Sequence, residues 1–343
     1  MRVVFVPSFP FSFLPPGGGV RQVLETKKHL KELGVEVDFW NPARNYAIER
    51  SVDIFHIFSS DFSLGQLAML IKRLGYPYVV STIFYPAEWS KRLAHRFLSK
   101  VPLTQVSWRR RLLRGADLLL PNSRSEARVL KELYGIPDNR FLIVPNAVDP
   151  NFIGDNPEGF RRKYLPELPP NEPFVLSVAL IEPRKNTLRL VKAAAKLGVP
   201  LVLVGPIVDH NYWRAIEEVS RERKSFLKHL GFLAHERLPD AYSAAHVHAL
   251  VSFLETPGLA SLEAGLNGAN LVVGSSPPVL EYLGQHAWVA NPHHLGSIAR
   301  NLELALNAPR DAKAASKHIA QSYTWEVAAT RTLEAYKQVL GLS

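Results

Sequence analysis

The chain has 343 residues, of which 47% are hydrophobic, and a formal net charge of +10. One hydrophobic core rarely supports this length, so we expect two domains. The chain contains no cysteine, which excludes disulfides, cysteine nucleophiles and thiolate metal sites. No apolar run reaches the ~18–20 residues of a membrane-spanning helix, and residues 2–7 lack the pattern of a signal peptide, so we expect a cytoplasmic protein.

The first half alternates between strand and helix patterns. A short β-branched run at residues 2–7 precedes a glycine-rich stretch at 16–19 and a helical pattern over 20–33, which Gly34 ends. Further strands are predicted at 35–40, 54–58, 78–81, 118–121 and 141–144. Helical patterns lie between them, and this alternation predicts a parallel sheet with helices on both faces.

A cluster of prolines and glycines over residues 150–173 indicates a linker, after which the alternation resumes. The predicted elements are strands at 174–178, 201–204, 247–251 and 271–274, and helices at 186–197, 258–266, 295–308 and 325–340, the last capped by Thr324. We therefore predict an α/β fold with two doubly wound domains, at 1–152 and 173–324, joined by a linker at 153–172. Ligands bind at the carboxyl ends of parallel strands, so two such edges could hold two substrates.

The second half contains two glutamates on either side of a turn, Glu255 and Glu263. Pro257 and Gly258 would form a turn with outward-facing N–H groups, and the following helix would direct its positive N-terminus at an anion. Glu263 could accept hydrogen bonds from the two hydroxyls of a ribose. A purely structural interpretation stays open, because glutamates also favour helix N-termini.

Two further segments have the composition of phosphate-binding loops. Arg184 and Lys185 lie between a predicted strand and a predicted helix, where a guanidinium fork and an ammonium group suit a diphosphate. A solvated turn with two exposed charges is the alternative. Gly17 to Gly19 follow the first strand, where glycines allow the backbone to approach a phosphate, although the segment lacks the GxGxxG pattern.

Taken together, these segments resemble the retaining glycosyltransferases of family 4, or glycosyl transferases group 1, which have the GT-B fold. The resemblance covers nearly the whole chain. The matching segments are Gly18–Val20, Ala116–Asp117, Pro121–Ser123, Val144–Asp149, Glu182–Asn186, Leu230–Phe232, Glu255 with Glu263, and Trp325 with Tyr336. The resemblance implies two Rossmann-like domains facing each other across a cleft, with the C-terminal helix, at about 325–343, crossing back to the N-terminal domain.

The resemblance also implies a hexosyltransferase that moves a sugar from a UDP- or GDP-sugar to a lipid-linked or polysaccharide acceptor in cell-envelope glycan synthesis. Lys185 would bind the donor diphosphate, Glu255 the sugar and Glu263 the ribose, so the expected catalytic residues are Lys185 and Glu255. The expected donor-binding residues are Gly18, Gly19, Arg184, Lys185, Gly231, Glu255, Gly258, Leu259, Ala260 and Glu263. Neither a metal nor another cofactor is expected, because Lys185 and the helix N-terminus can stabilise the leaving diphosphate.

Several positions depart from the family pattern. Ala179 and Leu180 stand where an arginine is usual, and His246 stands where an aspartate is common. Phe84 replaces a histidine that often lies near the reacting sugar. These departures leave open a catalytically impaired protein that binds nucleotide sugars on the same scaffold. The enzymatic alternatives are a sucrose-type synthase and a sugar-nucleotide epimerase, although the epimerases lack the paired glutamates.

The basic excess lies in the first half, where residues 1–150 carry 21 Lys and Arg against 13 Asp and Glu. Residues 90–114 contain eight of these basic residues and no acid, interleaved with tryptophan and leucine. This mixture at helical spacing favours docking on an anionic membrane, here its inner face, while a solvated helix face is the structural alternative. No nucleic-acid motif accompanies the charge, so nucleic acid is not an expected partner.

Overall fold

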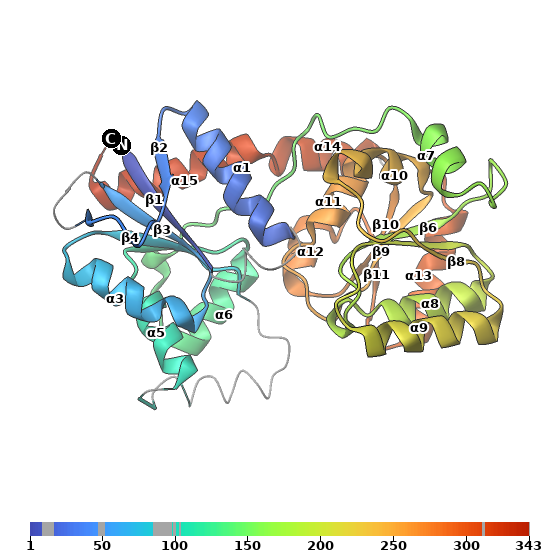
Figure 1. Cartoon of the computed structure of the whole chain (residues 1–343), viewed down its shortest axis with the longest axis horizontal. Coiled ribbons are helices and arrows are strands. Elements are labelled where there is room, and N and C mark those ends of the chain that lie inside the picture. The colour runs from blue at the N-terminus through green and yellow to red at the C-terminus, as the bar shows by residue number, and fades with distance from the viewer. Residues whose placement is uncertain are drawn as a thin grey trace. The chain divides into compact units, whose positions relative to one another are not determined.

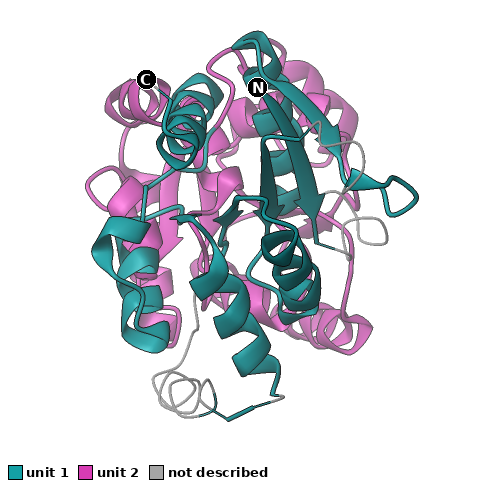
Figure 2. Cartoon of the chain, turned by 90° about the vertical axis from the view of Figure 1, so that its left-hand side faces the viewer, with its two compact units in different colours: residues 1–147, 325–343 teal, residues 148–324 magenta. Residues whose placement is uncertain are grey.

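The structure is a computed structural model, and it describes residues 1–8, 17–46, 52–84, 98, 101–102, 104–310 and 313–342. The chain forms two compact units, Met1–Ala147 with Trp325–Ser343, and Val148–Thr324 (Figure 2). The chain thus leaves the first unit once and returns to it for its last helix, as the C-terminal crossing implied.

The first unit is a parallel sheet covered by helices (Figure 1). Within the described residues, its strands are β1 (Arg2–Pro7), β2 (Glu36–Phe39), β3 (Ile54–Phe58), β4 (Tyr78–Ser81) and β5 (Leu118–Leu120). They pair in parallel in the order β2-β1-β3-β4-β5. The helices are α1 (Gly18–Glu32), α3 (Gly65–Arg73), α5 (Gln105–Gly115), α6 (Arg124–Tyr134) and α15 (Trp325–Leu340), with short 3-10 turns at η2 (Phe62–Leu64) and η3 (Asp138–Arg140).

The strands of the first unit are apolar on both faces because helices cover both faces. Successive residues of a strand point to opposite sides. Val4 and Val6 of β1 therefore pack in one cluster with residues of α3, α5 and α6. Val3 and Phe5 pack on the opposite face with residues of α1 and α15. The returning helix α15 thus completes one of the two hydrophobic layers of the first unit.

The second unit repeats this architecture with a sheet of six described strands, one more than in the first unit. Its described strands are β6 (Val175–Val178), β7 (Leu201–Val204), β8 (Leu227–His229), β9 (Val247–Leu250), β10 (Asn270–Gly274) and β11 (Trp288–Ala290). They pair in parallel in the order β11-β10-β9-β6-β7-β8. The helices are α7 (Pro157–Tyr164), α8 (Thr187–Leu197), α9 (His210–Arg223), α10 (Leu238–Ala244), α11 (Leu259–Leu266), α12 (Pro277–Leu283), α13 (Leu295–Asn307) and α14 (Lys313–Ser322), with 3-10 turns at η4 (Pro183–Lys185) and η5 (His235–Arg237).

The structure differs from two of the sequence predictions. The segment expected to be a linker, 153–172, contains α7, and the buried side chain of Phe160 packs in the core of the second unit. Pro157 stands in the first turn of α7 behind the capping side chain of Asn156, a position that suits proline because its missing N–H is not needed there. The unit boundary falls after Ala147. The predicted strand at 141–144 forms one bridge, between Phe141 and Leu119, and its amides at Leu142 and Val144 donate to the carbonyls of Leu119 and Pro121, but it does not form a regular strand.

No helix among the described residues is both long enough and apolar enough to cross a membrane. Of the basic segment 90–114, residues 90–97, 99, 100 and 103 lie outside the described residues.

Candidate active site

The sheet of the second unit reverses its direction of strand addition between β6 and β9. From β6 the chain adds β7 and β8 on one side, and it then adds β9, β10 and β11 on the other. In open parallel sheets, ligands bind outside the carboxyl ends of the strands at such a reversal, because the flanking loops diverge there. The loops that follow β6 and β9 are therefore where a site is expected.

An ion pair joins these two loops. Nζ of Lys185 lies 2.6 Å from Oε2 of Glu255, and the two side chains are 12% and 14% exposed. Ser252 Oγ donates a hydrogen bond to the same oxygen at 3.2 Å. Burial acts to raise the pKa of Glu255, but the charges of Lys185 and Arg184 and the hydrogen bonds outweigh it and lower that pKa. Glu255 is therefore a carboxylate at neutral pH, in contact with a cation and still reachable by a ligand.

Asn186 fixes the position of Lys185. It follows η4 in the left-handed conformation, with φ of +60°, which asparagine tolerates better than most residues. Its buried side-chain amide donates hydrogen bonds to the carbonyl of Val251 at 3.0 Å and to that of Pro292 at 2.8 Å. These bonds attach the turn after β6 to the chain that follows β9 and β11. This role was not predicted, because in the sequence Asn186 has the place of an ordinary helix start.

Arg184 lies in the same turn but points to other partners. Its Nη2 lies 2.6 Å from Oε1 of Glu182, and its side chain is 44% exposed. Its Nη1 donates to the carbonyl of Leu254 at 3.3 Å. An exposed guanidinium at this edge can turn toward an anionic ligand.

Gly258 opens helix α11 beside Glu255. Its φ is +87°, which side-chain-bearing residues rarely adopt, and a Cβ there would lie 3.0 Å from Cγ of Glu255. Glycine is therefore required both by the backbone conformation and by the close approach. Leu259 and Ala260 supply N–H groups of the first turn of α11, where an α-helix leaves its amides without intrahelical acceptors. The positive end of α11 thus begins next to the Lys185–Glu255 pair.

Glu263 is held in place by two residues from distant elements. Its carboxylate accepts from the hydroxyl of Tyr242 at 2.9 Å, and its other oxygen lies 2.8 Å from Nε2 of His235. Glu263 is 6% exposed. A carboxylate can accept about four hydrogen bonds, so these two leave acceptor positions for ribose hydroxyls. Spacing along the chain gives no sign of either partner, so neither was predicted.

The remaining predicted residues are Gly231, Gly18 and Gly19. Gly231 follows β8 with φ of +67°, and its carbonyl accepts from the amide of Gly205 at 2.8 Å. Gly18 and Gly19 belong to the first unit, where they form the first turn of α1 instead of a loop before it. The structure therefore brings together Arg184, Lys185, Glu255, Gly258, Leu259, Ala260 and Glu263 in the second unit.

His56, on β3, does not reach the edge of the first sheet. It is fully buried, with Nδ1 2.6 Å from the hydroxyl of Tyr336 and Nε2 2.9 Å from Oγ of Ser81. Burial lowers the pKa of His56 to about 3, so the ring is neutral at physiological pH. Its contacts join β3 to β4 and to the returning helix α15.

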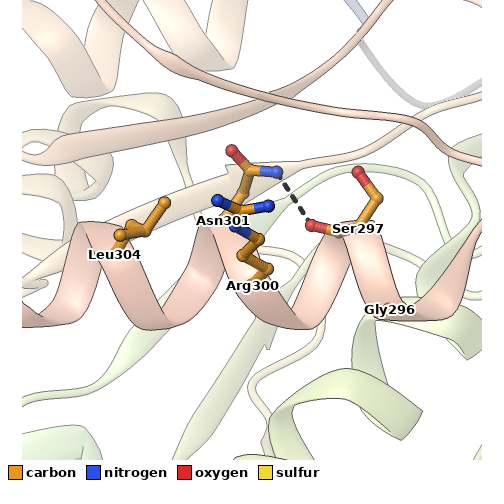
Figure 3. Close-up of a pocket in the computed structure, with 5 residues that line it drawn as sticks. All are labelled: Gly296, Ser297, Arg300, Asn301 and Leu304. Carbon is orange, nitrogen blue, oxygen red and sulfur yellow. Dashed lines mark hydrogen bonds between the residues drawn. The ribbon is translucent and has the colours of Figure 1, made fainter.

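The second unit has two surface hollows that the Lys185–Glu255 pair does not line. One of about 390 Å³ is lined by Pro183, Asn186, Leu188, Arg189, Lys192, Tyr212, Phe253 and Leu295. The other, of about 540 Å³, follows one face of α13, where Asn301 donates a hydrogen bond to the carbonyl of Ser297 at 2.8 Å (Figure 3). Neither is lined by Lys185 or Glu255. Among the residues that the structure describes, no group of three or more His, Asp or Glu could hold a metal ion.

Two family models match the chain. Glycosyl transferases group 1 matches residues 162–322, and Glycosyltransferase Family 4 matches residues 39–152. The chain is 30% identical over 364 residues to the D-inositol 3-phosphate glycosyltransferase of Stackebrandtia nassauensis, covering 98% of this chain and 77% of the relative. It is 28% identical over 240 residues to O-antigen chain mannosyltransferase B of Escherichia coli, covering 66% of this chain and 61% of the relative. It spans 29% of a serotype-specific mannosyltransferase WbdA of that species.

Solved structures agree on the fold. Sucrose-phosphate synthase of Thermosynechococcus elongatus aligns with a TM-score of 0.84 at 17% identity, over 100% of both chains. HepE of Anabaena, in complex with UDP and glucose, aligns with a TM-score of 0.77 at 17% identity, over 98% of this chain and 100% of the other.

The two parallel sheets and these likenesses define a two-domain GT-B fold, as the sequence predicted. The protein belongs to the group 1 glycosyltransferases, of the family 4 type, as the sequence indicated.

Proposed function

We propose that the protein transfers a hexose from a nucleotide-diphosphate sugar to a glycan acceptor, with retention of the anomeric configuration. The observation that carries this proposal is the Lys185–Glu255 pair at the reversal point of the sheet, beside the N-terminus of α11. The leaving group of such a donor is a nucleoside diphosphate. An ammonium group and aligned N–H groups stabilise the negative charge that develops on it.

Each residue of the group has a distinct role in this proposal. Lys185 has three N–H donors, so it can keep its bond to Glu255 and bind the diphosphate with the others. Glu255 accepts hydrogen bonds from the sugar hydroxyls, and Glu263 accepts those of the ribose. The exposed guanidinium of Arg184 adds positive charge at the same edge. This set neutralises a diphosphate with protein groups, and on that basis we propose that no metal is needed.

The names of the relatives support a choice of substrates. Several are named as mannosyltransferases, one of them of the O-antigen chain, and one solved neighbour is a complex with UDP-glucose. We therefore propose a GDP- or UDP-hexose as the donor, and a lipid-linked or polysaccharide acceptor of cell-envelope glycan synthesis.

Helix α5 supports a further part of the proposal, docking of the first unit on the inner face of an anionic membrane. Arg110, Arg111 and Arg114 lie on this helix, and the guanidinium of Arg111 lies 4.8 Å from the ring centre of Trp108. Basic and aromatic side chains together suit the headgroup region of a bilayer. Arg109, which was expected to act with them, contacts loops of its own unit.

A donor screen tests the proposal. UDP-, GDP-, ADP- and dTDP-sugars are added one at a time, and thermal unfolding is followed. A ligand that binds the native state raises its stability by about 2.7 kcal/mol at one hundred times its Kd. The stabilising donor is then incubated with glycan acceptors, and the anomeric configuration of the product is read by NMR.

The outcomes separate the two candidate functions. Transfer with retention supports the proposal, and inversion or the absence of any stabilising nucleotide sugar overturns it. Stabilisation with neither transfer nor donor hydrolysis identifies the catalytically impaired binding protein, which Phe84 favours because it stands where the family often has a histidine.

A further inference from the structure

Two residues at the carboxyl edge of the first sheet have strained backbones. Ser59 follows β3 with φ of +146°, and Ile83 lies two residues after β4 with φ of +43°. A positive φ is unusual for any residue other than glycine and is a clear outlier for a β-branched one such as isoleucine. Such a residue is destabilising and persists only where its surroundings hold it.

Glu126 holds the loop that contains Ile83. This glutamate lies in the first turn of α6 and is fully buried. Its Oε1 accepts from Oγ1 of Thr82 at 2.5 Å and from the amide of Phe84 at 2.7 Å, while its Oε2 accepts from the amide of Asn122 at 2.8 Å. The strained residue thus lies between two residues that are both bound to one carboxylate.

These contacts go beyond what a helix cap needs. Ser123 and Glu126 have the spacing of a capping box, and Oγ of Ser123 accepts from the amide of Glu126 at 3.1 Å. In that motif the glutamate reaches back to the amide of the capping residue. Here it binds the amide of Asn122, one residue earlier, and two groups of the loop after β4. The capping box explains the hydrogen bond of Ser123. It does not explain why Glu126 also binds Thr82 and Phe84.

Arg109 connects this loop to the one after β3. Its Nε donates to the carbonyl of Ser60 at 2.7 Å, next to the strained Ser59. The same guanidinium lies 5.2 Å from the ring centre of Phe84. The two loops are therefore fixed by two charged side chains from helices outside the strand ends, Glu126 from α6 and Arg109 from α5.

The position of these loops indicates what they serve. The first sheet reverses its direction of strand addition between β1 and β3, so the loop after β3 lies at the ligand edge of this sheet, and the loop after β4 is its neighbour. The donor-binding group lies in the second unit. In a reaction with two substrates, the edge of the first unit is left for the acceptor.

We propose that Glu126 and Arg109 are positioning residues of the transfer reaction, which hold residues 59–60 after β3 and 82–84 after β4 in the strained form that receives the acceptor glycan. This inference rests on the proposed function. Neither side chain touches the sugar, and both act through the backbone at Ser60 and Phe84. Reacting groups that are displaced by about 1 Å can lose 10²-fold in rate, so a loop that relaxes should weaken transfer strongly.

The test compares Glu126→Ala with Glu126→Gln, with Glu132→Gln as the matched control, because Glu132 lies exposed on the same helix. We expect Glu126→Ala to raise the acceptor KM and to lower the ratio of transfer to donor hydrolysis, each by about 10–100-fold. Glutamine keeps one acceptor oxygen for the loop but turns an amide toward Asn122, so Glu126→Gln should lie between. Nucleotide Kd should stay unchanged in all three.

Two further variants keep the test decisive if Glu126→Ala does not fold. Thr82→Val removes one hydrogen bond to Glu126 at nearly constant volume, and Arg109→Lys keeps the charge but loses the guanidinium that bridges Ser60 and Phe84. Both should lower the ratio of transfer to hydrolysis at temperatures well below Tm.

A fall in transfer and hydrolysis by the same factor, or an unchanged acceptor KM, would overturn this inference and leave the proposed function standing. If the unaltered chain neither transfers nor hydrolyses any nucleotide sugar, the proposed function fails and this inference fails with it.

Discussion

The two units build the same kind of sheet and use charge at its ligand edge in opposite ways. In the second unit, Lys185 and Glu255 are partly exposed and can contact a substrate. In the first unit, the carboxylate of Glu126 is fully buried and binds backbone and a hydroxyl of its own loops. A charge that binds a ligand has to stay accessible, whereas a charge that shapes a loop is most effective where water is excluded.

Removing the ammonium group of Lys185 should have the largest effect. We expect Lys185→Ala to lower kcat/KM by roughly 10²–10³-fold, which corresponds to about 2.7–4 kcal/mol of lost transition-state stabilisation. Lys192→Ala is the matched control, because Lys192 is an exposed lysine on the adjoining helix α8. Steady-state kinetics with the donor found by the screen measures both. Near-normal turnover of Lys185→Ala would remove this residue from the mechanism.

Charge reversal on α5 tests whether the first unit uses its solvent-accessible arginines to bind an anionic membrane. Changing Arg110, Arg111 and Arg114 to Glu should release the protein from anionic liposomes, because each such residue near the surface contributes about 1 kcal/mol. Three such residues together correspond to a factor of roughly one hundred or more in the partitioning of the protein between liposomes and solution. This effect should weaken at high salt. Sedimentation with liposomes at two salt concentrations measures it.

The control for α5 is the same triple reversal at Arg221, Arg223 and Lys224, which are exposed at the end of α9 in the second unit. Equal loss of liposome binding in both triple variants would mean that net charge alone governs binding. Lost nucleotide binding in the α5 variant would mean that these arginines support the fold.

The anchoring of Glu263 can be measured as stability. Tyr242→Phe removes the hydroxyl that donates to this carboxylate at 2.9 Å. Hydrogen bonds to charged groups contribute about 1.5–3 kcal/mol, so the free energy of unfolding should fall by about that amount. Tyr323→Phe is the control, since its hydroxyl makes a long 3.5 Å contact to the carbonyl of Glu281. Equal urea midpoints for the two variants would contradict the expected anchoring role.

A buried histidine makes the second unit sensitive to acid. His248, on β9, is fully buried, neither ring nitrogen has a hydrogen-bond partner among the described residues, and burial lowers its pKa to about 3. In the unfolded chain the pKa is about 6.5. Between pH 6.5 and pH 3 the unfolded state therefore binds one more proton than the folded state, and the free energy of unfolding decreases as the pH is lowered.

His248→Leu should therefore become more stable than the original chain as the solution is acidified. The difference in unfolding free energy should widen by about 1.6 kcal/mol between pH 6.5 and pH 5. Urea titrations at the two pH values measure it, and His294→Leu, at an exposed histidine, is the control. A constant difference would show that His248 is already protonated in the folded protein at pH 5.

The smallest expected effect is that of chelation. Lys185 and the first turn of α11 supply positive charge for the diphosphate, so we expect transfer to continue in EDTA at an unchanged rate. Loss of activity that Mg²⁺ or Mn²⁺ restores would contradict this account of the leaving group.

Periodicity and glycine placement predicted most strands of both sheets, because each strand is a short apolar run next to a turn signal. The Pro157 region was taken for a linker because proline breaks regular structure in general, yet it is favourable in the first turn of a helix. The segment 141–144 was predicted as a strand and pairs with the chain at 119–121 through two backbone hydrogen bonds, but it forms only one bridge and no regular strand.

Within the candidate site, the sequence pointed to Lys185 and Glu255, which lie 70 residues apart in the chain and 2.6 Å apart in the structure. Glu126 was missed because a serine and a glutamate at capping-box spacing already have a local explanation. His235 and Tyr242 contact Glu263 through tertiary packing, which no periodicity along the chain encodes.

The return of α15 to the first unit has a consequence during biosynthesis. Residues 148–324 are synthesised before the buried side chains of Trp325 and Tyr336. At about 5–20 residues per second, the first unit waits roughly 10–40 s for its last helix. During that time the layer that contains Val3 and Phe5 lacks part of its cover. The nascent chain therefore exposes this apolar layer, which chaperones can bind, until its last helix has been synthesised.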